Sequence, residues 1–446
     1  MLSRLILKEF YSDVPIKNDF VIRKEDFGLT IFNKKNLKHI HLDKIGEHII
    51  YNINSKNTIG QIVERVANDL KKPKALISLI VLEYLKSLND SEFIKLESIP
   101  NIKTISKQQN HPLTSAPNQI SWIITNQCNL RCSHCANKNS LKMPNELTTT
   151  EAIQFVNDCA KHKVFILNIS GGEPFIRKDF FEILEQARDL GIEIGITTNG
   201  TIINEETVKK LQKLSPFNIH ISFDGIGKVH DSFRNKSGVY SKVIETIALF
   251  KKYNIPFGLT TSISKLNFHD IDNIKDFVKR EGITSWEIYY AIPIGNLAKN
   301  MALSDKEYVE LAKKVDSYKK ELASMCNIFV GDSLGYFCDY KIRDEEWKGC
   351  LAGLNHCAIG SEGEIKGCPI QPDEFIEGNI RKDNLFDIWR NPRSFKYNRE
   401  PIVLEKHCKK CKYSKECRAG CKTAMYTQHT GLTYNNLCVR HIQSIH

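Results

Sequence analysis

The spacing of hydrophobic positions divides the 446 residues into segments with different periods. Residues 1–97 begin with short β-prone stretches and continue with helical periodicity. Asn57 and Thr58 stand where the second helix should begin, because short polar side chains cap helix N-termini. Three strands followed by three helices predict a small winged-helix-like α+β module. The expected strands are 20–23, 29–32 and 39–42, and the expected helices are 47–53, 59–70 and 75–88.

Residues 119–299 alternate β-prone and helical stretches at an even spacing. Strands with helices between them predict an α/β fold whose parallel sheet curves into a partial (β/α)6 barrel of the TIM type. The reactive groups of such barrels gather at the carboxyl ends of the strands. The expected strands are 120–125, 164–169, 192–197, 217–223, 257–263 and 285–290, with helices at 147–161, 180–190, 205–214, 240–253 and 271–280.

The segments on either side of this barrel are less regular. Residues 98–118 are polar and interrupted by prolines, which predicts a linker. Residues 300–446 begin with a helix at 306–322 and then become irregular and rich in cysteine. The chain therefore divides into an N-terminal module, a linker, a barrel and a cysteine-rich tail.

Composition points to a cytoplasmic protein with metal centres. The N-terminus lacks the long apolar run of a secretory signal, and no run of about eighteen apolar residues could span a membrane. In a reducing compartment, 14 clustered cysteines are read as metal ligands before disulfides. The net charge is +11, and the tail from Arg399 onward holds much of it. Because thiolate-bound clusters are anionic, we attribute this basic tail to charge balance rather than to nucleic-acid binding.

The sequence C-N-L-R-C-S-H-C follows the first barrel strand directly. Its cysteines, Cys128, Cys132 and Cys135, can converge on one metal centre. Structural zinc normally takes four ligands, and ferredoxin-type clusters use a full set of cysteines. A cubane held by three cysteines keeps one iron open to another molecule. The triplet therefore predicts an open iron–sulfur cluster at the carboxyl end of the barrel.

This triplet resembles the signature of radical S-adenosylmethionine (SAM) enzymes, in which SAM chelates the open iron. The motifs G-G-E-P, T-T-N-G and S-F-D-G follow the second, third and fourth strands, as in that family. Glycine permits the close backbone approach that a ligand amino group requires. Arg234 is similar to the family arginine near the SAM carboxylate, and His134 fills the position that is commonly aromatic beside adenine. The resemblance implies SAM contacts from His134, Gly171, Gly172, Glu173, Pro174, Thr198, Asn199, Ser222, Asp224 and Arg234.

A second cysteine set resembles the SPASM extension of radical SAM enzymes that modify peptides and proteins. It consists of C-x12-G-x4-C, then C-x2-C-x5-C-x3-C, and a final cysteine. The resemblance implies two auxiliary [4Fe–4S] clusters beside the SAM-binding [4Fe–4S] cluster. Its pattern assigns Cys350, Cys368 and Cys421 to the nearer auxiliary cluster, and Cys408, Cys411, Cys417 and Cys438 to the farther one.

The nearer cluster lacks a fourth ligand in this pattern. The segment A-I-G-S-E-G-E-I-K-G predicts a hairpin turning at Glu362–Gly363, which would place Cys357 opposite Cys368. Cross-strand partners lie about 5 Å apart, so Cys357 is the first candidate. Cys338 is the second candidate, and an open site is the third possibility. Structural zinc is the alternative for the whole tail, whereas Cys159 and Cys326 are expected to be core residues.

The N-terminal module resembles the leader-recognition (PqqD-like) domain of enzymes that mature ribosomally made peptides. That family binds the precursor's leader as an added strand on the edge of the third strand. Lys34, Lys35 and Lys38 flank this edge and would suit an acidic leader. A solvated edge charged against aggregation is the alternative. As a plain winged helix the module could bind DNA, but its nearly neutral charge argues against this.

The order of modules resembles the subtilosin-type sactipeptide maturases. This resemblance implies an enzyme that uses a 5′-deoxyadenosyl radical to install a modification, with a thioether crosslink the first expectation, in a ribosomal precursor peptide. The expected partners are that peptide, bound through its leader, and a flavodoxin- or ferredoxin-type electron donor, with no nucleic acid and no membrane.

Other functions remain open at this stage. Anaerobic sulfatase maturases resemble the barrel and tail, but they carry an Asp directly after the hairpin cysteine, where this chain has Pro369. Carbon–carbon crosslinking, epimerisation and decarboxylation share the same architecture. A zinc-bound binding adaptor without catalytic activity is the alternative from another class.

Overall fold

The structure is a computed structural model that describes residues 13–97, 112–136, 143–334, 349–400, 403–428 and 433–445. The chain folds as two compact units, which divide between Ser115 and Ala116. Each unit has its own hydrophobic core.

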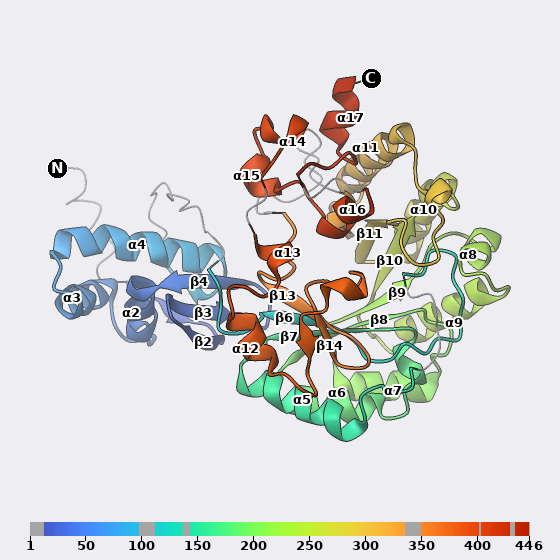
Figure 1. Cartoon of the computed structure of the whole chain (residues 1–446). Helices are drawn as coiled ribbons and strands as arrows, with labels where there is room; N and C mark the ends of the chain where they lie inside the picture. Colours follow the sequence, from blue (N-terminus) through green and yellow to red (C-terminus); the bar gives the residue numbers. More distant parts are fainter. Residues whose placement is uncertain are drawn as a thin grey trace. The chain divides into compact units, whose positions relative to one another are not determined.

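The first unit is an α+β module with a three-stranded antiparallel sheet in the order β2–β3–β4 (Figure 1). The predicted strands and helices are confirmed, and Thr58 caps α3 in a capping box with Gln61. A short β1–β5 pair was not predicted. The elements are β1 (Ile16–Lys17), β2 (Val21–Glu25), β3 (Gly28–Phe32), β4 (His39–Asp43), α2 (Lys44–Asn52), α3 (Ile59–Asp69), α4 (Lys74–Asp90) and β5 (Ile94–Lys95).

The second unit is built on one sheet, in which the described residues form the order β12–β11–β10–β9–β8–β7–β6–β13–β14–β15. The six predicted barrel strands are confirmed as β6–β11, and all pair in parallel. The strands are β6 (Gln119–Ile123), β7 (Ile166–Ser170), β8 (Glu193–Thr198), β9 (Asn218–Ser222), β10 (Gly258–Ile263), β11 (Ser285–Tyr290), β12 (Asn327–Val330), β13 (His356–Ile359), β14 (Glu364–Lys366) and β15 (Gly378–Asn379).

Helices follow the strands and cover the outer face of the sheet, as Figure 1 shows for α5, α6 and α7 beside β6, β7 and β8. Thr148 caps α5 in a capping box with Glu151. The helices are α5 (Thr149–Lys161), α6 (Phe180–Asp189), α7 (Glu205–Leu214), α8 (Lys228–Phe233), α9 (Val239–Lys252), α10 (Ile271–Glu281) and α11 (Asp305–Glu321). Further along are α12 (Leu385–Arg390), α13 (Lys396–Arg399), α14 (Lys406–Lys409), α15 (Ser414–Cys417), α16 (Lys422–Thr427) and α17 (Val439–Ile445).

The cysteine-rich tail shares the barrel's sheet. β13 pairs in parallel with β6, and β14 and β15 extend the sheet beyond it. At the other end β12 adds to β11, which the sequence did not predict. The predicted division at 299/300 therefore falls within one continuous sheet.

The two faces of the barrel strands differ in polarity. Residues on the outer face are apolar and fully buried, for example Trp122, Ile196 and Ile221. Alternate residues on the inner face are mostly polar and half-buried, and Thr197 is exposed. A closed TIM barrel fills its interior with bulky apolar side chains. The inner face of this sheet instead presents polar, partly exposed side chains, and the side of the sheet that it faces is called the lumen below.

The register of the β13–β14 hairpin corrects the prediction for Cys357. Ile359 pairs with Ile365 and Ala358 with Lys366, so a three-residue loop replaces the predicted two-residue turn. A shift of one residue moves every side chain to the other face of the strand. Continued past the end of β14, this register makes His356 rather than Cys357 correspond to Cys368, and Cys357 lies on the outer face.

Candidate active site

The three cysteines after β6 lie close together. Cys132 is buried, whereas Cys128 and Cys135 are half-buried. The backbone N–H of Leu130 and the Asn199 amide donate to the Cys128 sulfur, at 3.4 and 3.8 Å. Burial raises the pKa of the Cys128 thiol, and the nearby Cys132 and Cys135 raise it further. The loop therefore brings the Cys132 and Cys135 sulfurs near the Cys128 sulfur.

The donor set of this loop fits an iron–sulfur cluster. Within the described residues, no three His, Cys, Asp or Glu side chains converge closely enough to bind a single metal ion. The thiolates of a cubane each bind a different iron, so they lie further apart than ligands of one ion. Hydrogen bonds to sulfur, such as those on Cys128, are among the features that tune such clusters.

The glycines of G-G-E-P allow the backbone after β7 to lie against the start of the cysteine loop. A Cβ on Gly171 would lie 2.4 Å from the Thr125 oxygen, and one on Gly172 would lie 2.2 Å from the Gln127 oxygen. The Gly172 N–H donates to Thr125 and the Glu173 N–H donates to Gln127, both at 2.8 Å. Larger residues would separate these segments, so both glycines set the position of the cysteine loop.

Glu173 is a fully buried carboxylate at the centre of the strand ends. It accepts hydrogen bonds from the Thr198 hydroxyl at 2.8 Å and the Asn199 N–H at 2.7 Å, with the Phe175 N–H at 3.3 Å. Burial raises its pKa to about 7, although these donors oppose the shift. A buried carboxylate with this pKa favours a cationic ligand, because a cation would offset the cost of ionisation.

Arg234 and Asp224 form a buried ion pair beside the cysteine loop. Arg234 also donates to the Cys132 sulfur at 3.8 Å, and Asp224 accepts from the Ser262 N–H at 2.8 Å. Burial raises the pKa of Asp224, and Arg234 opposes the shift. The predicted SAM contact Asp224 therefore orients Arg234, and Arg234 in turn places a positive charge next to Cys132.

His134 stacks on Phe233, with ring centroids 4.2 Å apart. Its Nδ1 is buried and has no hydrogen-bond partner among the described residues. Burial lowers the pKa of His134 well below its usual value, and Arg234 lowers it further, so the ring is neutral. A neutral, stacked ring suits the predicted position beside an adenine.

The remaining predicted SAM contacts also lie at the strand ends. Pro174 is buried at the start of a 3-10 turn, and Thr198 and Asn199 are held by Glu173. Ser222 ends β9 on its inner face and is half-buried. The structure thus brings the motifs of four separate strands to one edge of the sheet.

The loop after β11 contributes residues that the sequence reasoning missed. Asn296 donates its N–H to the Cys135 oxygen at 2.8 Å and its side-chain amide to the Cys132 oxygen at 3.2 Å. A Cβ on Gly295 would lie 2.3 Å from the Cys135 oxygen. The sequence signal is the short G-N pair after a strand, which is too common to stand out.

A polar cluster within the lumen was also missed. His220 Nδ1 lies 2.8 Å from Glu287 Oε2, which also accepts from Thr260 at 3.2 Å and Tyr289 at 3.3 Å. His220 is buried, whereas the Glu287 side chain is 27% exposed. A Cβ on Gly258 would lie 2.7 Å from the imidazole, so this glycine makes room for the ring. The cluster presents a fixed carboxylate to the lumen.

The second cysteine set forms two groups. Burial, with Asp332 and Cys368 nearby, raises the pKa of Cys350 to about 12. Burial also raises the pKa of Cys421, and Cys350 and Cys368 raise it further. The structure therefore places Cys350, Cys368 and Cys421 near one another.

The second group lies between α14 and α17. Burial raises the pKa of Cys408, and Cys438 and Cys411 raise it further. Cys417 ends α15. The structure thus brings Cys408, Cys411 and Cys438 together, with Cys417 on the intervening helix.

The other cysteines have different surroundings. Cys357 is fully buried on the outer face of β13. It lies near Cys159 of α5, since a charge on Cys357 raises the pKa of the Cys159 thiol after the larger effect of burial. Cys159 and Cys326 are buried, which confirms them as core residues. Cys338 lies outside the described residues.

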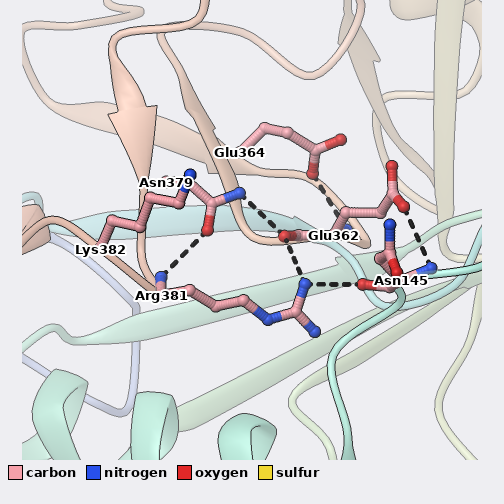
Figure 2. A pocket seen from close by; sticks show the side chains of 6 residues that line it. All are labelled: Asn145, Glu362, Glu364, Asn379, Arg381 and Lys382. Carbon is pink, nitrogen blue, oxygen red and sulfur yellow. Dashed lines mark hydrogen bonds between the residues drawn. The ribbon is translucent and has the colours of Figure 1, made fainter.

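A surface pocket of about 540 Å³ lies beside the hairpin loop (Figure 2). Arg381 reaches across it to donate to the Asn145 and Glu362 oxygens, at 2.7 and 3.3 Å, and it forms an ion pair with Glu151. Asn145 also donates to Glu362 at 3.2 Å. These contacts hold the hairpin against the segment before α5. The pocket contains none of the predicted site residues.

Comparison with known families agrees with this geometry. Residues 122–278 match the radical SAM superfamily, and residues 350–421 match SPASM, an iron–sulfur cluster-binding domain. The chain belongs to the radical SAM superfamily, and its barrel with the SPASM extension is the fold of that class. Its cofactors are accordingly SAM and [4Fe–4S] clusters.

Individual relatives carry different names. The chain is 31% identical over 329 residues to the AdoMet-dependent heme synthase of Methanosarcina barkeri, a match covering 70% of this chain and 93% of that protein. It is 28% identical over 342 residues to the mycofactocin maturase MftC of Mycobacterium ulcerans, covering 74% and 89%.

The fold is similar to Streptococcus suis SuiB bound to S-adenosylmethionine, with a TM-score of 0.71, 20% identity and coverage of 95% of this chain and 99% of that one. SuiB bound to its precursor peptide SuiA aligns with a TM-score of 0.70 and 19% identity, over 95% and 100%. Among the helices of the described residues, none has the length and apolarity that crossing a membrane requires.

Proposed function

We propose that the protein is a peptide maturase that installs a thioether crosslink in a ribosomal precursor peptide. The observation that carries this proposal is the N-terminal module together with the barrel and SPASM tail. The structural alignment with SuiB covers 95% of this chain, so it includes most of the N-terminal module. The sequence match with the heme synthase covers 70% of this chain.

The module offers an edge for a leader peptide. β4 is the terminal strand of the three-stranded sheet in the described residues, and it is the third strand of that sheet along the chain. Tyr84 of α4 donates to Asp43 at the end of β4 at 2.6 Å, which holds the helix beside this strand. Leu76 and Leu79 of α4 are about half exposed. A leader strand on β4 would gain backbone hydrogen bonds and could cover apolar surface on α4.

The barrel supplies the reaction site. We assign Cys128, Cys132 and Cys135 to the SAM-binding cluster, with Glu173 facing the SAM amino group and Arg234 its carboxylate. When bound, SAM and the cluster supply a 5′-deoxyadenosyl radical that removes a hydrogen atom from a substrate carbon. Asp224 fixes Arg234, and Asn296 fixes the cysteine loop, so that the bound group is oriented without further rearrangement.

The lumen would hold the residue that is modified. Its inner face is polar, and Thr197 is exposed on it. The Glu287 carboxylate, fixed by His220, can accept a hydrogen bond from a substrate N–H, O–H or S–H group. Forming the thioether joins a cysteine sulfur to a carbon and removes one hydrogen from each. One hydrogen would leave as a hydrogen atom and the other as a proton. The remaining electron would need an acceptor, which a cluster held by Cys350, Cys368 and Cys421 would supply.

Heme formation is the second candidate function, because the 31% identical relative is named a heme synthase. The two candidates differ in their substrates. The test is anaerobic reconstitution of the full chain with SAM and a strong reductant, with either the peptide encoded beside its gene or an iron porphyrin. A peptide mass lower by about two hydrogens per crosslink supports the maturase. Heme appearing in place of a modified peptide would establish the other candidate.

Leader docking has its own test. The double charge reversal Lys35→Glu/Lys38→Glu places acidic groups beside β4 and should raise the KM for an acidic leader about tenfold, with SAM cleavage unchanged. Lys71→Glu/Lys72→Glu, in the exposed loop between α3 and α4, is the matched control. Equal KM values for both variants would contradict an acidic leader on this edge.

A further inference from the structure

The ligand set of the nearer auxiliary cluster is incomplete with three cysteines. Cys350, Cys368 and Cys421 act on one another electrostatically, and the hairpin register removes Cys357 from their neighbourhood. A cubane has four irons, so one corner of this cluster lacks a protein ligand in the cysteine pattern.

His356 stands where that ligand is missing. The β13–β14 ladder pairs Ala358 with Lys366, where β14 ends. The same register continued by two residues makes Cys368 the position that corresponds to His356. Directly opposed residues have Cβ atoms about 5 Å apart. The β-bridge between Ala352 and His356 folds the chain after Cys350 back onto the same strand. The bridge therefore returns the chain to β13 within six residues of Cys350.

The His356 imidazole also has unused bonding capacity. Its Nδ1 is buried and has no hydrogen-bond partner in the part of the chain that the structure describes. Burying a polar atom without a hydrogen-bond partner costs free energy. The unpaired Nδ1 therefore indicates a bound group that is not part of the polypeptide. Asp332 lies near the same site, since it raises the pKa of Cys350, Cys368 and Cys421 after the larger effect of burial.

We propose that Nδ1 of His356 is the fourth protein ligand of the iron–sulfur cluster held by Cys350, Cys368 and Cys421. This inference rests on the proposed function only in assuming that a cluster forms at these cysteines. Nitrogen ligation has a precedent in Rieske centres, where histidine in place of cysteine raises the reduction potential. A neutral imidazole adds no negative charge, so this cluster accepts an electron more readily than one with four thiolates.

The test uses the full chain, anaerobically reconstituted, with Cys128, Cys132 and Cys135 replaced by alanine to remove the first cluster. Labelling with ¹⁵N-histidine and pulsed EPR of the reduced protein should show a histidine nitrogen coupled to a cluster. His356→Ala should abolish the coupling and lower the iron content by about one atom per chain. His356→Cys should restore the iron without the coupling and shift the cluster to a lower potential.

Cys357→Ala is the matched control, because it changes the adjacent residue on the other face of β13. It should leave the nitrogen coupling and iron content unchanged. Coupling that survives in His356→Ala would assign the ligand to another histidine and overturn the proposal. Absence of the coupling from the parent protein with full iron would also overturn it, in favour of Asp332 or Cys338. An unchanged iron content in Cys350→Ser would instead show that no cluster forms here, which defeats the auxiliary-cluster proposal itself.

Discussion

Glu173 is the site residue whose replacement has the most clearly calculable effect. It is fully buried between three hydrogen-bond donors, and burial raises its pKa from 4.5 to about 7. The folded protein without SAM therefore holds this proton more tightly than the unfolded chain does. Stability from this group is complete below the unfolded pKa and is lost as the pH rises through about 7.

The size of this pH effect on stability follows from the pKa shift of Glu173. Between about pH 5.5 and about pH 8, ionisation of Glu173 should lower the free energy of unfolding by about 2 kcal/mol. Glu173→Gln cannot ionise, so this decline should be absent from the variant. The amide would also fail to match all three donors, which costs about 1–3 kcal/mol at every pH. The variant is thus expected to be less stable at acidic pH and closer to the original protein at alkaline pH.

The assay is urea unfolding of the cluster-free full chain at a series of pH values. Glu193→Gln, another carboxylate of the same sheet, is the control and should follow the original protein. Parallel pH profiles for the original protein and Glu173→Gln would refute the buried, proton-binding carboxyl group. In the reconstituted protein the same variant should bind SAM at least about tenfold more weakly, since a charge-assisted hydrogen bond is lost.

Other predictions concern packing, charge and substrate binding. Gly172→Ala puts a Cβ 2.2 Å from the Gln127 oxygen, which should strain the fold by about 1–3 kcal/mol. Deoxyadenosine formation, measured by chromatography, should therefore fall by about tenfold or more. Normal formation would show that the loop adjusts freely. Arg234→Leu leaves Asp224 as a buried lone charge and should destabilise the fold by about 3–5 kcal/mol in urea unfolding, whereas adding Asp224→Asn should recover part of the loss. No recovery would argue against the pair. Glu287→Gln should slow peptide modification about tenfold while SAM cleavage without peptide is retained, and unchanged peptide turnover would remove Glu287 from the substrate site.

Much of the fold was predictable because its signals are local. Alternating periods located the six barrel strands, and the helix caps Thr58 and Thr148 follow from side-chain bonds to nearby backbone groups. The cysteine spacings and strand-end motifs identified the first site, since parallel strands bring their carboxyl ends to one edge. These features depend on neighbours in the sequence or on a general rule of the fold.

The sequence alone therefore determined the barrel strands and the spacing of Cys128, Cys132 and Cys135 after the first of them. Tertiary structure decided the rest. A three-residue loop shifted the hairpin register by one position, which moved Cys357 to the outer face and His356 to the inner face of β13. The His220–Glu287 pair joins strands that are far apart in sequence. Such contacts depend on register and on which faces meet, and neither quantity is encoded in the period of one segment.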